Sequence, residues 1–382
     1  MKLKYFEIRD VFKKYPDMTM YLLFGERSNG KTYSCLDYVI QDYAEHGHQG
    51  AYIRRSREDI KPAVTAELFK NHIKNGRFDK FFGKLDLPWN TTKTKGGYIY
   101  PQHVWFTDSG VRKSRTAEEP ILLVNALSTW QHTKGVSFPD VKTVIFDEFL
   151  TPGLYLPDEV NIFQNLLSSF VRERGDVKVI LVGNTVSKYS PYFSELGLNN
   201  VGNMKPGECQ VYESGDKKAK YLVMFTDGTG GKDSDKYFSI FNNQTSAMIT
   251  GGAWEMSAYP IIKPEMANAD RVETFFISFT DKLVRGEVVT IGGQIYVLFT
   301  PSKKSNMYDA DGYRTGWYQD KIVYTDFLSL HLLDRFNIIE QKDNLSKLVK
   351  LAILQGRAYY AKNEVGDLVS HYFKWCKMYE AL

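Results

Sequence analysis

The feature that most constrains the fold is a glycine-rich loop at Phe24–Ser34, which reads FGERSNGKTYS. The loop matches the pattern G-x-x-x-x-G-K-[ST] at every fixed position, and such a match arises by chance on the order of 0.02 times in a chain of this size. The apolar stretch Met20–Phe24 precedes it, and Cys35, Val39 and Ile40 follow at helical spacing. A strand, a loop and a helix in this order let successive backbone N–H groups surround phosphate oxygens.

The loop side chains have expected roles in holding a nucleoside triphosphate. Lys31 is expected on the β- and γ-phosphate oxygens, and the Thr32 hydroxyl is expected on Mg²⁺. An ordinary glycine turn is the alternative, but it explains neither the lysine nor the flanking strand and helix. The other nucleotide-binding positions predicted for the loop are Gly25, Glu26, Arg27, Ser28, Asn29 and Gly30.

Short β-branched runs alternate with helical patterns along the first half of the chain. Four of them are expected to be strands, at Met20–Phe24, Gly50–Arg55, Val141–Phe146 and Val177–Val182. Such runs, bounded by polar turns, are typical of buried parallel strands. The pattern predicts an α/β domain of the P-loop NTPase class, of the ASCE or RecA-like type, with helices on both faces of a parallel sheet.

An acidic pair ends the third of these strands, in the segment Thr143–Glu148, which reads TVIFDE. Ligands of open α/β sheets bind at the carboxyl ends of the strands. Asp147 is therefore expected to hold Mg²⁺, and Glu148 to orient and deprotonate an attacking water. A glutamate in that place favours hydrolysis over phosphate transfer to a small molecule. The alternative is an acidic strand end that caps a loop.

Further polar residues are candidates for contacting the phosphates. Asn184 ends the fourth strand, where it could contact the γ-phosphate or the water, or cap a turn instead. Charge on the transferring phosphoryl group also requires a cation. Arg27 in the loop is one candidate, and Arg172 and Arg174 at the end of a predicted helix are two more. For this pair, the alternative is favourable charge at a helix C-terminus.

The long insertion between the second and third strands combines basic and aromatic residues. A net charge of +4 permits a polyanionic partner without requiring one. The mixture suits phosphate contact and base stacking, although aromatic residues at strand spacing also serve packing. Further candidates for the cation near the phosphoryl group are Arg54, Arg55, Arg57, Arg112, Lys113 and Arg115, and a solvated face is the favoured alternative for them. The insertion residues concerned are Lys93, Lys95, Arg112, Lys113, Arg115 and Lys134, with Tyr98, Tyr100, Trp105 and Trp130.

The chain of 382 residues is expected to form two domains. We predict a P-loop domain over residues 1–205, a Gly- and Asn-rich linker over 206–250, and a smaller α+β domain over 251–382. The sequence has no apolar run of about 18 residues and no secretory signal pattern, which predicts a cytoplasmic protein without a membrane span.

The order of these motifs resembles that of the genome-encapsidation ATPases of small tailed bacteriophages, compact relatives of the large terminase motors. The resemblance covers the whole N-terminal domain and agrees with the chain length and the small C-terminal domain. It is carried by the loop with Arg27, Tyr52-Ile-Arg54-Arg55, Leu127-Ser-Thr-Trp130-Gln131, Ile145-Phe-Asp147-Glu148-Phe149, Pro157-Asp-Glu-Val160, Phe170-Val-Arg172-Glu-Arg174, and Asn184 followed by Pro191-Tyr-Phe193.

The resemblance implies an ATP-hydrolysing ring, commonly of five subunits, that drives double-stranded DNA into a procapsid. The ring would act in the host cytoplasm while docked on the procapsid portal, and a packaging RNA is a further candidate partner. Arg172, or Arg174 as second choice, would act on the nucleotide of the neighbouring subunit. Lys134 would be among the insertion residues that face DNA.

The resemblance also implies an RNase H-like C-terminal domain. The expected strands Phe275–Phe279 and Gln294–Phe299 carry no Asp or Glu, so we expect a nuclease-like shape without nuclease activity. Asp281 and Asp326 could belong to a displaced acid cluster, but they are more typical of turns and caps. Three other classes stay open: a helicase or AAA+-like remodelling ATPase, a nucleotide-gated scaffold with negligible turnover, and, least favoured, a small-molecule kinase.

Overall fold

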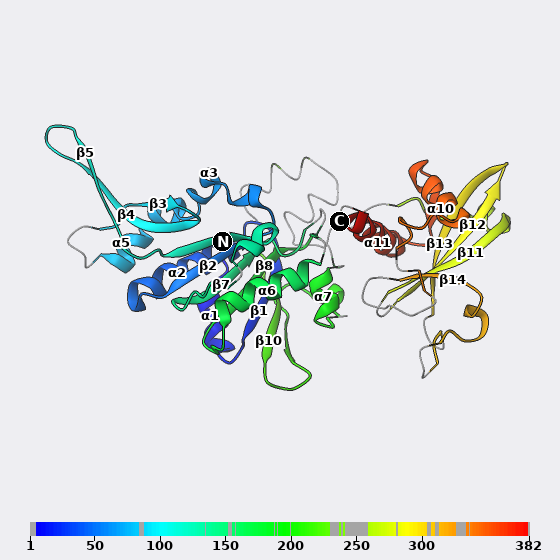
Figure 1. The fold of residues 1–382 in the computed structure, drawn as a ribbon, viewed down its shortest axis with the longest axis horizontal. Coiled ribbons are helices and arrows are strands. Elements are labelled where there is room, and N and C mark those ends of the chain that lie inside the picture. Colours follow the sequence, from blue (N-terminus) through cyan, green and yellow to red (C-terminus); the bar gives the residue numbers. More distant parts are fainter. Residues whose placement is uncertain are drawn as a thin grey trace. The chain divides into compact units, whose positions relative to one another are not determined.

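The computed structural model divides the chain into two compact units (Figure 1). Unit 1 comprises Met1–Lys188 and Asn200–Trp254, and unit 2 comprises Tyr189–Asn199 and Glu255–Leu382. The structure describes residues 5–83, 88–133, 135–151, 155, 156, 158–186, 188, 190–198, 200–229, 237, 240, 259–279, 282–303, 307–309, 313–325, 334, 335 and 337–380.

Unit 1 is built on a sheet of ten strands in the order β3-β4-β6-β2-β7-β8-β1-β10-β9, with β5 paired to β4. The strands from β6 to β10 in this order run parallel, as predicted. The strands are β1 (Met20–Gly25), β2 (Gln49–Arg54), β3 (Thr91–Lys95), β4 (Tyr98–Phe106), β5 (Arg112–Thr116), β6 (Leu122–Ala126), β7 (Val141–Asp147), β8 (Lys178–Asn184), β9 (Cys209–Glu213) and β10 (Lys220–Phe225).

Helices cover both faces of this sheet, because alternate residues of each buried strand point to opposite sides. Ile145 of β7 belongs to the core beneath α1 and α2, whereas its neighbour Phe146 stacks on Phe163 of α6 at 5.3 Å between ring centroids. The helices are α1 (Ile8–Lys14), α2 (Lys31–His46), α3 (Pro62–Thr65), α4 (Lys70–Lys74), α5 (Arg77–Phe82) and α6 (Glu159–Val171), with the 3₁₀ turns η1 (Arg57–Ile60), η2 (Leu127–Thr133) and η3 (Val201–Asn203).

The strand order places β8 between β1, which carries the glycine loop, and β7, which carries the acidic pair. The carboxyl ends of these three parallel strands therefore meet at one edge of the sheet. The predicted linker 206–250 is wrong for its first half. Strands β9 and β10 lie within it, and β10 pairs in parallel with β1 from Met20 to Phe24. The rest of that segment lies largely outside the described residues.

The insertion after β2 contains the antiparallel strands that the alternating pattern predicted. Strand β4 pairs with β3 and β5, and the β4–β5 hairpin extends away from the rest of unit 1 (Figure 1). The stretch Ile121–Val124 is expected in the same small hairpin unit, but this prediction is only partly right. It leads into β6, which pairs with β4 but also joins β2 in parallel as part of the main sheet.

Unit 2 contains a five-stranded sheet in the order β14-β11-β12-β13-β15. The predicted hairpin at Ile291-Gly-Gly-Gln294 joins β12 to β13. The first predicted closing helix ends early, at Leu354, because Gly356 turns with φ of 69° and residues 358–360 pair with β13. The elements are α7 (Pro191–Glu195), η4 (Pro264–Asn268), β11 (Asp270–Ser278), β12 (Leu283–Ile291), β13 (Gln294–Ser302), η5 (Gly316–Tyr318), β14 (Ile322–Thr325), α10 (Asn344–Leu354), β15 (Ala358–Tyr360) and α11 (Asn363–Glu380).

Helices α10 and α11 pack on one face of this second sheet, where Val349 and Tyr372 join a core with Phe275, Val297 and Phe299. This is the α+β unit that the sequence predicts. Among the described residues, none of the helices combines the length and apolarity that a membrane span requires.

Candidate nucleotide site

The glycine loop has the backbone geometry that its two glycines predict. Gly30 caps the N-terminus of α2 with φ of 93°, a left-handed conformation that favours glycine. Gly25 ends β1, and a Cβ atom there would lie 2.3 Å from Thr226 Oγ1. The close approach of Thr226 therefore excludes a side chain at Gly25, which brings the loop against the segment that follows β10.

Lys31 lies buried within the loop. Its Nζ donates hydrogen bonds to the backbone oxygen of Glu26 at 2.7 Å and to Asn29 Oδ1 at 3.0 Å. The ammonium is thus directed into the turn, where phosphate oxygens of a bound nucleotide would compete for the same hydrogens. This position fits the predicted phosphate contact of Lys31.

Two loop residues predicted to bind nucleotide also hold the loop in place through their side chains. Asn29 Nδ2 donates to Thr226 Oγ1 at 2.8 Å and to the backbone oxygen of Asp227 at 3.3 Å. The buried Glu26 accepts a hydrogen bond from the backbone N–H of Thr229 at 3.0 Å. No local sequence pattern indicates this anchor, because residues 226–229 follow the loop by about 200 positions.

Asp147 and Thr32 meet at the edge of the sheet, as the order of motifs predicts. The Thr32 hydroxyl donates to Asp147 Oδ1 at 2.9 Å, and the Tyr52 hydroxyl donates to Asp147 Oδ2 at 2.6 Å. Burial and the Asp147 carboxylate raise the pKa of Tyr52 well above its usual value, which keeps the phenol protonated as a donor. The hydroxyl and carboxylate oxygens of Thr32 and Asp147 are ligands that suit Mg²⁺.

Glu148 stands one residue beyond Asp147, with a left-handed backbone at φ of 60°. Arg54 Nη2 donates to Glu148 Oε2 at 2.7 Å, and Arg54 Nη1 lies 3.5 Å from Asp147 Oδ2. Burial by itself would lower the pKa of Arg54, but Tyr52 and the two carboxylates raise it instead. The Glu148 side chain remains half exposed, so one part of it reaches solvent while Arg54 fixes the other.

Arg55 supports the backbone beneath this acidic pair. Its guanidinium binds the buried Glu159 of α6 through two bonds, at 2.7 and 2.9 Å, and donates to the backbone oxygens of Glu148 at 3.0 Å and Phe149 at 2.9 Å. The expectation of a solvated face for Arg54 and Arg55 is therefore wrong. Both side chains are largely buried because β2 ends directly beside β7. Arg57 is exposed, as expected.

Asn184 lies beside the start of the glycine loop. It is the last residue of β8 and is paired in register with Gly25 of β1, and the following Thr185 N–H donates to the Gly25 oxygen at 3.3 Å. The structure thus brings Asn184 to the same edge as Asp147, which is what its predicted role requires. Arg27 is an exposed residue of the loop.

The two arginines after α6 lie at the opposite edge of the sheet from the acidic pair. Arg174 donates to the backbone oxygens of Phe138 at 3.0 Å and Val141 at 3.2 Å, and also to those of Pro139 and Phe170. These four bonds fasten the turn before β7, which argues against Arg174 as a mobile finger. Arg172 is exposed, with a single bond from Nη2 to the Gly135 oxygen at 2.9 Å.

Most of the basic insertion residues suited to phosphate contact lie on the strands β3 and β5, and one lies outside the described residues. Arg112, Lys113 and Arg115 are exposed on β5, and Lys95 is exposed at the end of β3. Arg115 also lies over the Trp89 ring, 5.7 Å from its centroid. Lys134, predicted to face DNA, lies outside the described residues, as do Pro157, Asp281 and Asp326.

Comparisons with known proteins agree with this geometry. Residues 121–215 match the model of the Podovirus DNA encapsidation protein (Gp16) family. The matched segment contains the acidic pair, both arginines after α6 and Asn184. A DNA packaging protein of Bacillus phage B103 is 28% identical over 193 residues, which are 48% of this chain and 49% of that protein. That of Bacillus phage phi29 is 27% identical over 187 residues, 46% of each.

The chain thus spans about half the length of the packaging proteins that it matches in sequence. Its fold is similar to that of a solved structure titled the Phi-28 gp11 DNA packaging motor, with a TM-score of 0.56, 16% identity, and coverage of 98% of this chain and 99% of that one. The bacteriophage Phi-29 viral genome packaging motor assembly gives a TM-score of 0.55 at 18% identity, with the same coverage.

These matches confirm the expected fold class and the resemblance that the motif order predicted. Over residues 121–215, the chain is similar to the Podovirus DNA encapsidation protein (Gp16) family.

Proposed function

We propose that the chain is the ATP-hydrolysing motor that packages double-stranded viral DNA into a procapsid. The observation that carries this proposal is the 2.9 Å hydrogen bond from Thr32 to Asp147, because it joins the phosphate-binding loop to a strand end that bears a second acid, Glu148. The similarity to phage packaging proteins supports DNA packaging as the process that this hydrolysis drives.

Each residue at the site has a separate task in the proposed reaction. Backbone N–H groups of the loop and the Lys31 ammonium bind the phosphates of ATP, and Thr32 and Asp147 hold Mg²⁺. A Mg²⁺ ion held there would supply positive charge to the phosphoryl oxygens. Glu148 orients a water and accepts its proton, while Arg54 fixes the carboxylate.

Arg172 is proposed to act on the nucleotide of a neighbouring subunit in a ring, and the family resemblance implies that this ring is a pentamer. Its position supports this role. Strand β7 has seven residues and therefore separates Asp147 from the turn at Val141 by roughly 20 Å. Because Arg174 is bound to that turn, the adjacent Arg172 lies too far away to reach the phosphates of its own subunit.

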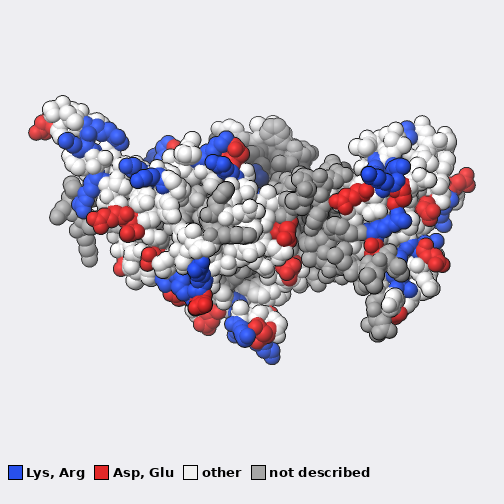
Figure 2. All heavy atoms as spheres, viewed as in Figure 1, with Lys and Arg blue, Asp and Glu red and all other residues white. Residues whose placement is uncertain are grey.

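The β4–β5 hairpin is proposed as a DNA-contacting arm of unit 1. Basic side chains gather along it (Figure 2), and Phe106 and Val111 are 68% and 52% exposed at its tip. Subunits of a ring would add their few cations around one duplex, so the modest net charge of +4 is sufficient. The basic residues concerned are Arg112, Lys113 and Arg115 on β5, together with Lys93 and Lys95 on β3, which pairs with β4.

Unit 2 is proposed to be a docking or DNA-contact module without nuclease activity. A two-metal nuclease requires carboxylates that are free to bind metal. Glu287 is instead paired with Arg271 at 2.9 Å and with Arg285 at 3.4 Å, and Asp334 is paired with Arg314 at 3.3 Å. A procapsid portal, and a packaging RNA where one exists, are the partners that the family resemblance implies.

Measurement of phosphate release tests the proposed function. We expect ATP hydrolysis that rises when double-stranded DNA is added and rises less with single strands. A duplex-unwinding assay separates the motor from the alternative, a helicase or AAA+-like remodelling ATPase. Strand separation coupled to hydrolysis would favour the helicase, and nucleotide binding without turnover would favour a nucleotide-gated scaffold.

A subunit-mixing experiment tests Arg172. Arg172→Ala subunits are mixed into wild-type protein in increasing fractions, and DNA-stimulated hydrolysis is measured at constant total protein. An arginine acting across a subunit boundary predicts a loss steeper than the fraction of variant. A linear loss would show that each subunit works independently of its neighbour's Arg172.

A further inference from the structure

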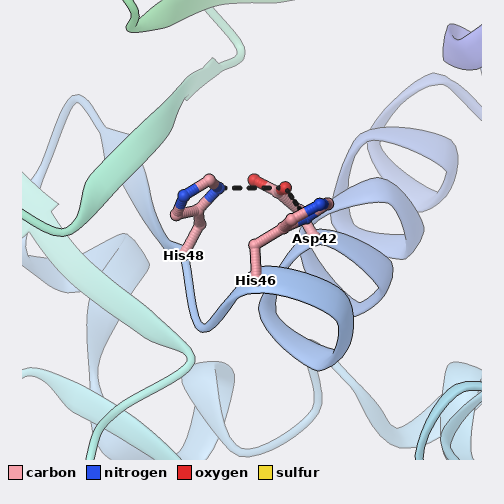
Figure 3. A group of neighbouring side chains, drawn as sticks. All are labelled: Asp42, His46 and His48. Atoms are coloured by element: carbon pink, nitrogen blue, oxygen red, sulfur yellow. Dashed lines mark hydrogen bonds and ion pairs between the residues drawn. The ribbon is translucent and has the colours of Figure 1, made fainter.

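Three side chains form a compact group at the end of α2 that is remote from the glycine loop (Figure 3). His46 Nδ1 and His48 Nδ1 each lie 3.1 Å from the same oxygen, Asp42 Oδ1. One ligand atom from each residue lies within 4.8 Å of the others. Asp42 and His46 occupy positions i and i+4 of the helix, and Gly47 turns the chain with φ of 73° so that His48 points back at them.

The burial of the group suits a binding site that opens to solvent. The Asp42 side chain is 13% exposed, whereas His46 and His48 are 54% and 37% exposed. The carboxylate is therefore mostly buried, and the two imidazole rings are more exposed to solvent. The two rings are nearly parallel, with centroids 5.2 Å apart and an angle of 19° between their planes.

The spacing of the group is close to what a transition-metal ion requires. Zn²⁺ binds imidazole nitrogen and carboxylate oxygen at about 2.0–2.2 Å with tetrahedral geometry, which places neighbouring ligand atoms about 3.3 Å apart. The two measured N···O distances of 3.1 Å already approach this value. Small ring rotations would bring both nitrogens and the carboxylate around one ion.

We propose that Asp42, His46 and His48 form a binding site for a first-row transition-metal ion, with Zn²⁺ as the best match. Two imidazoles and one carboxylate favour Zn²⁺, Cu²⁺ or Ni²⁺ over Mg²⁺, whereas the all-oxygen pair Thr32 and Asp147 favours Mg²⁺. The chain therefore carries two cation sites of different chemistry. The fourth position of the histidine site stays open to water.

The place of the site in the fold suggests a structural role. Helix α2 begins at Lys31 in the glycine loop, and β2 ends at Arg54 beside Glu148. A metal bound by Asp42, His46 and His48 would join the last turn of that helix to the residue before that strand. It would thus stabilise the α2–β2 connection, which links two elements of the nucleotide site.

Titration calorimetry of the full-length chain with Zn²⁺ tests this proposal, with Mg²⁺ kept in excess to occupy the nucleotide site. Wild-type protein is expected to bind one Zn²⁺ per chain that the double variant His46→Gln/His48→Gln does not bind. Each single replacement, and Asp42→Asn, should weaken binding by more than the roughly 10–100-fold that loss of an outer-shell group causes. Zn²⁺ should also raise the unfolding temperature of the wild type but not of the double variant.

Two matched variants serve as controls. Glu45→Gln changes an exposed acid in the same turn of α2, and His103→Gln changes a histidine on the β4–β5 hairpin. Both should bind Zn²⁺ like the wild type. Circular dichroism checks that every variant is folded. Equal Zn²⁺ affinity in the wild type and in the folded double variant would overturn the proposal and leave the group as a helix-end hydrogen-bond network.

Discussion

One glutamate in each of the two units differs from the other in its exposure and in the number of arginines that it contacts. In unit 1, Glu148 lies at a strand end with its side chain 54% exposed, and a single arginine, Arg54, holds it from one side. In unit 2, Glu287 lies within β12, is 8% exposed, and is held between Arg271 and Arg285. Both are glutamates in ion pairs with arginine, but the side chain of the first is exposed to solvent and that of the second is enclosed.

This difference indicates that the position of a carboxylate in a sheet decides whether it is accessible for a reaction or contributes to stability. A carboxylate at the carboxyl edge of parallel strands stays accessible, whereas a carboxylate in the middle of an antiparallel ladder is enclosed by neighbouring strands. We therefore expect charge changes in unit 1 near the loop to alter turnover, and charge changes in unit 2 to alter stability alone.

The largest effect is expected for Glu148→Gln. Loss of the general base should lower kcat for ATP hydrolysis by about 10²–10⁴-fold, while nucleotide affinity is retained because Lys31 and Thr32 are unchanged. Steady-state phosphate release and binding of a fluorescent ATP analogue measure the two quantities. The matched variant Glu287→Gln should hydrolyse ATP at the wild-type rate. Similar losses of turnover in both variants would remove the distinction between the two sheets.

The next largest effect concerns stability in unit 1. Arg55→Ala would leave the buried Glu159 without its bidentate partner, and loss of one member of a buried ion pair costs about 3–5 kcal/mol in the free energy of unfolding. Denaturant titration measures it. The exposed neighbour Arg57 provides the control, because Arg57→Ala should change stability by less than about 0.5 kcal/mol. Equal effects at both positions would show that Glu159 finds another partner.

A smaller and pH-dependent effect is expected at Asp37, a buried acid of unit 1 that lies in α2 between Arg9 and Arg77. Burial by itself would raise the pKa of Asp37, but Arg77 and Arg9 lower it below the usual value. A carboxyl group with a lowered folded-state pKa stabilises the protein above its unfolded pKa of about 3.9, and this contribution is lost as the pH falls through the folded value.

Asp37→Asn should therefore destabilise the protein by about 2 kcal/mol at pH 7, the contribution typical of hydrogen bonds to a charged group. The difference from the wild type should shrink as the pH falls below about 4. Denaturant titrations at several pH values measure it. A constant difference across that range would mean that Asp37 stabilises through packing, not through its charge.

The smallest of these effects is expected for Arg54→Ala. Without its 2.7 Å contact, Glu148 should be less well oriented, and kcat should fall by roughly tenfold, about 1.4 kcal/mol, with little change in KM. Arg54→Lys retains one donor and should lose less. A rate above that of the wild type would instead show that Arg54 restrains Glu148 and has to release it before hydrolysis.

The local parts of this architecture could be predicted from the sequence. The glycine loop, the strand that precedes it and the acidic pair are contiguous patterns whose residue types follow from phosphate and metal chemistry. For the same reason the β12–β13 hairpin follows from its Gly-Gly turn. Asp42, His46 and His48 also form a contiguous pattern, but histidines at a helix end have too many ordinary uses to predict a site.

The long-range contacts could not be predicted in this way. The sequence pattern predicts a linker where β9 and β10 lie, because β10 pairs with β1 about 200 positions earlier and β9 pairs with β10, which no local period reveals. The hydrogen-bond partners of Arg54 and Arg174 could not be predicted for the same reason. An arginine gives the same local sequence pattern in each environment. Its side chain can face solvent, pair with an acid at a strand end as Arg54 does, or donate to backbone oxygens as Arg174 does. The strand order distinguishes these environments, because it determines which elements lie beside each arginine.

A triplex-displacement assay tests the central claim most directly, because it detects movement along duplex DNA that does not separate the strands. A third strand bound to the duplex is labelled, and its release is followed after addition of ATP. The account predicts release with the wild type and ATP, and none with a non-hydrolysable analogue or with Glu148→Gln. DNA-stimulated ATP hydrolysis that leaves the third strand in place would contradict it.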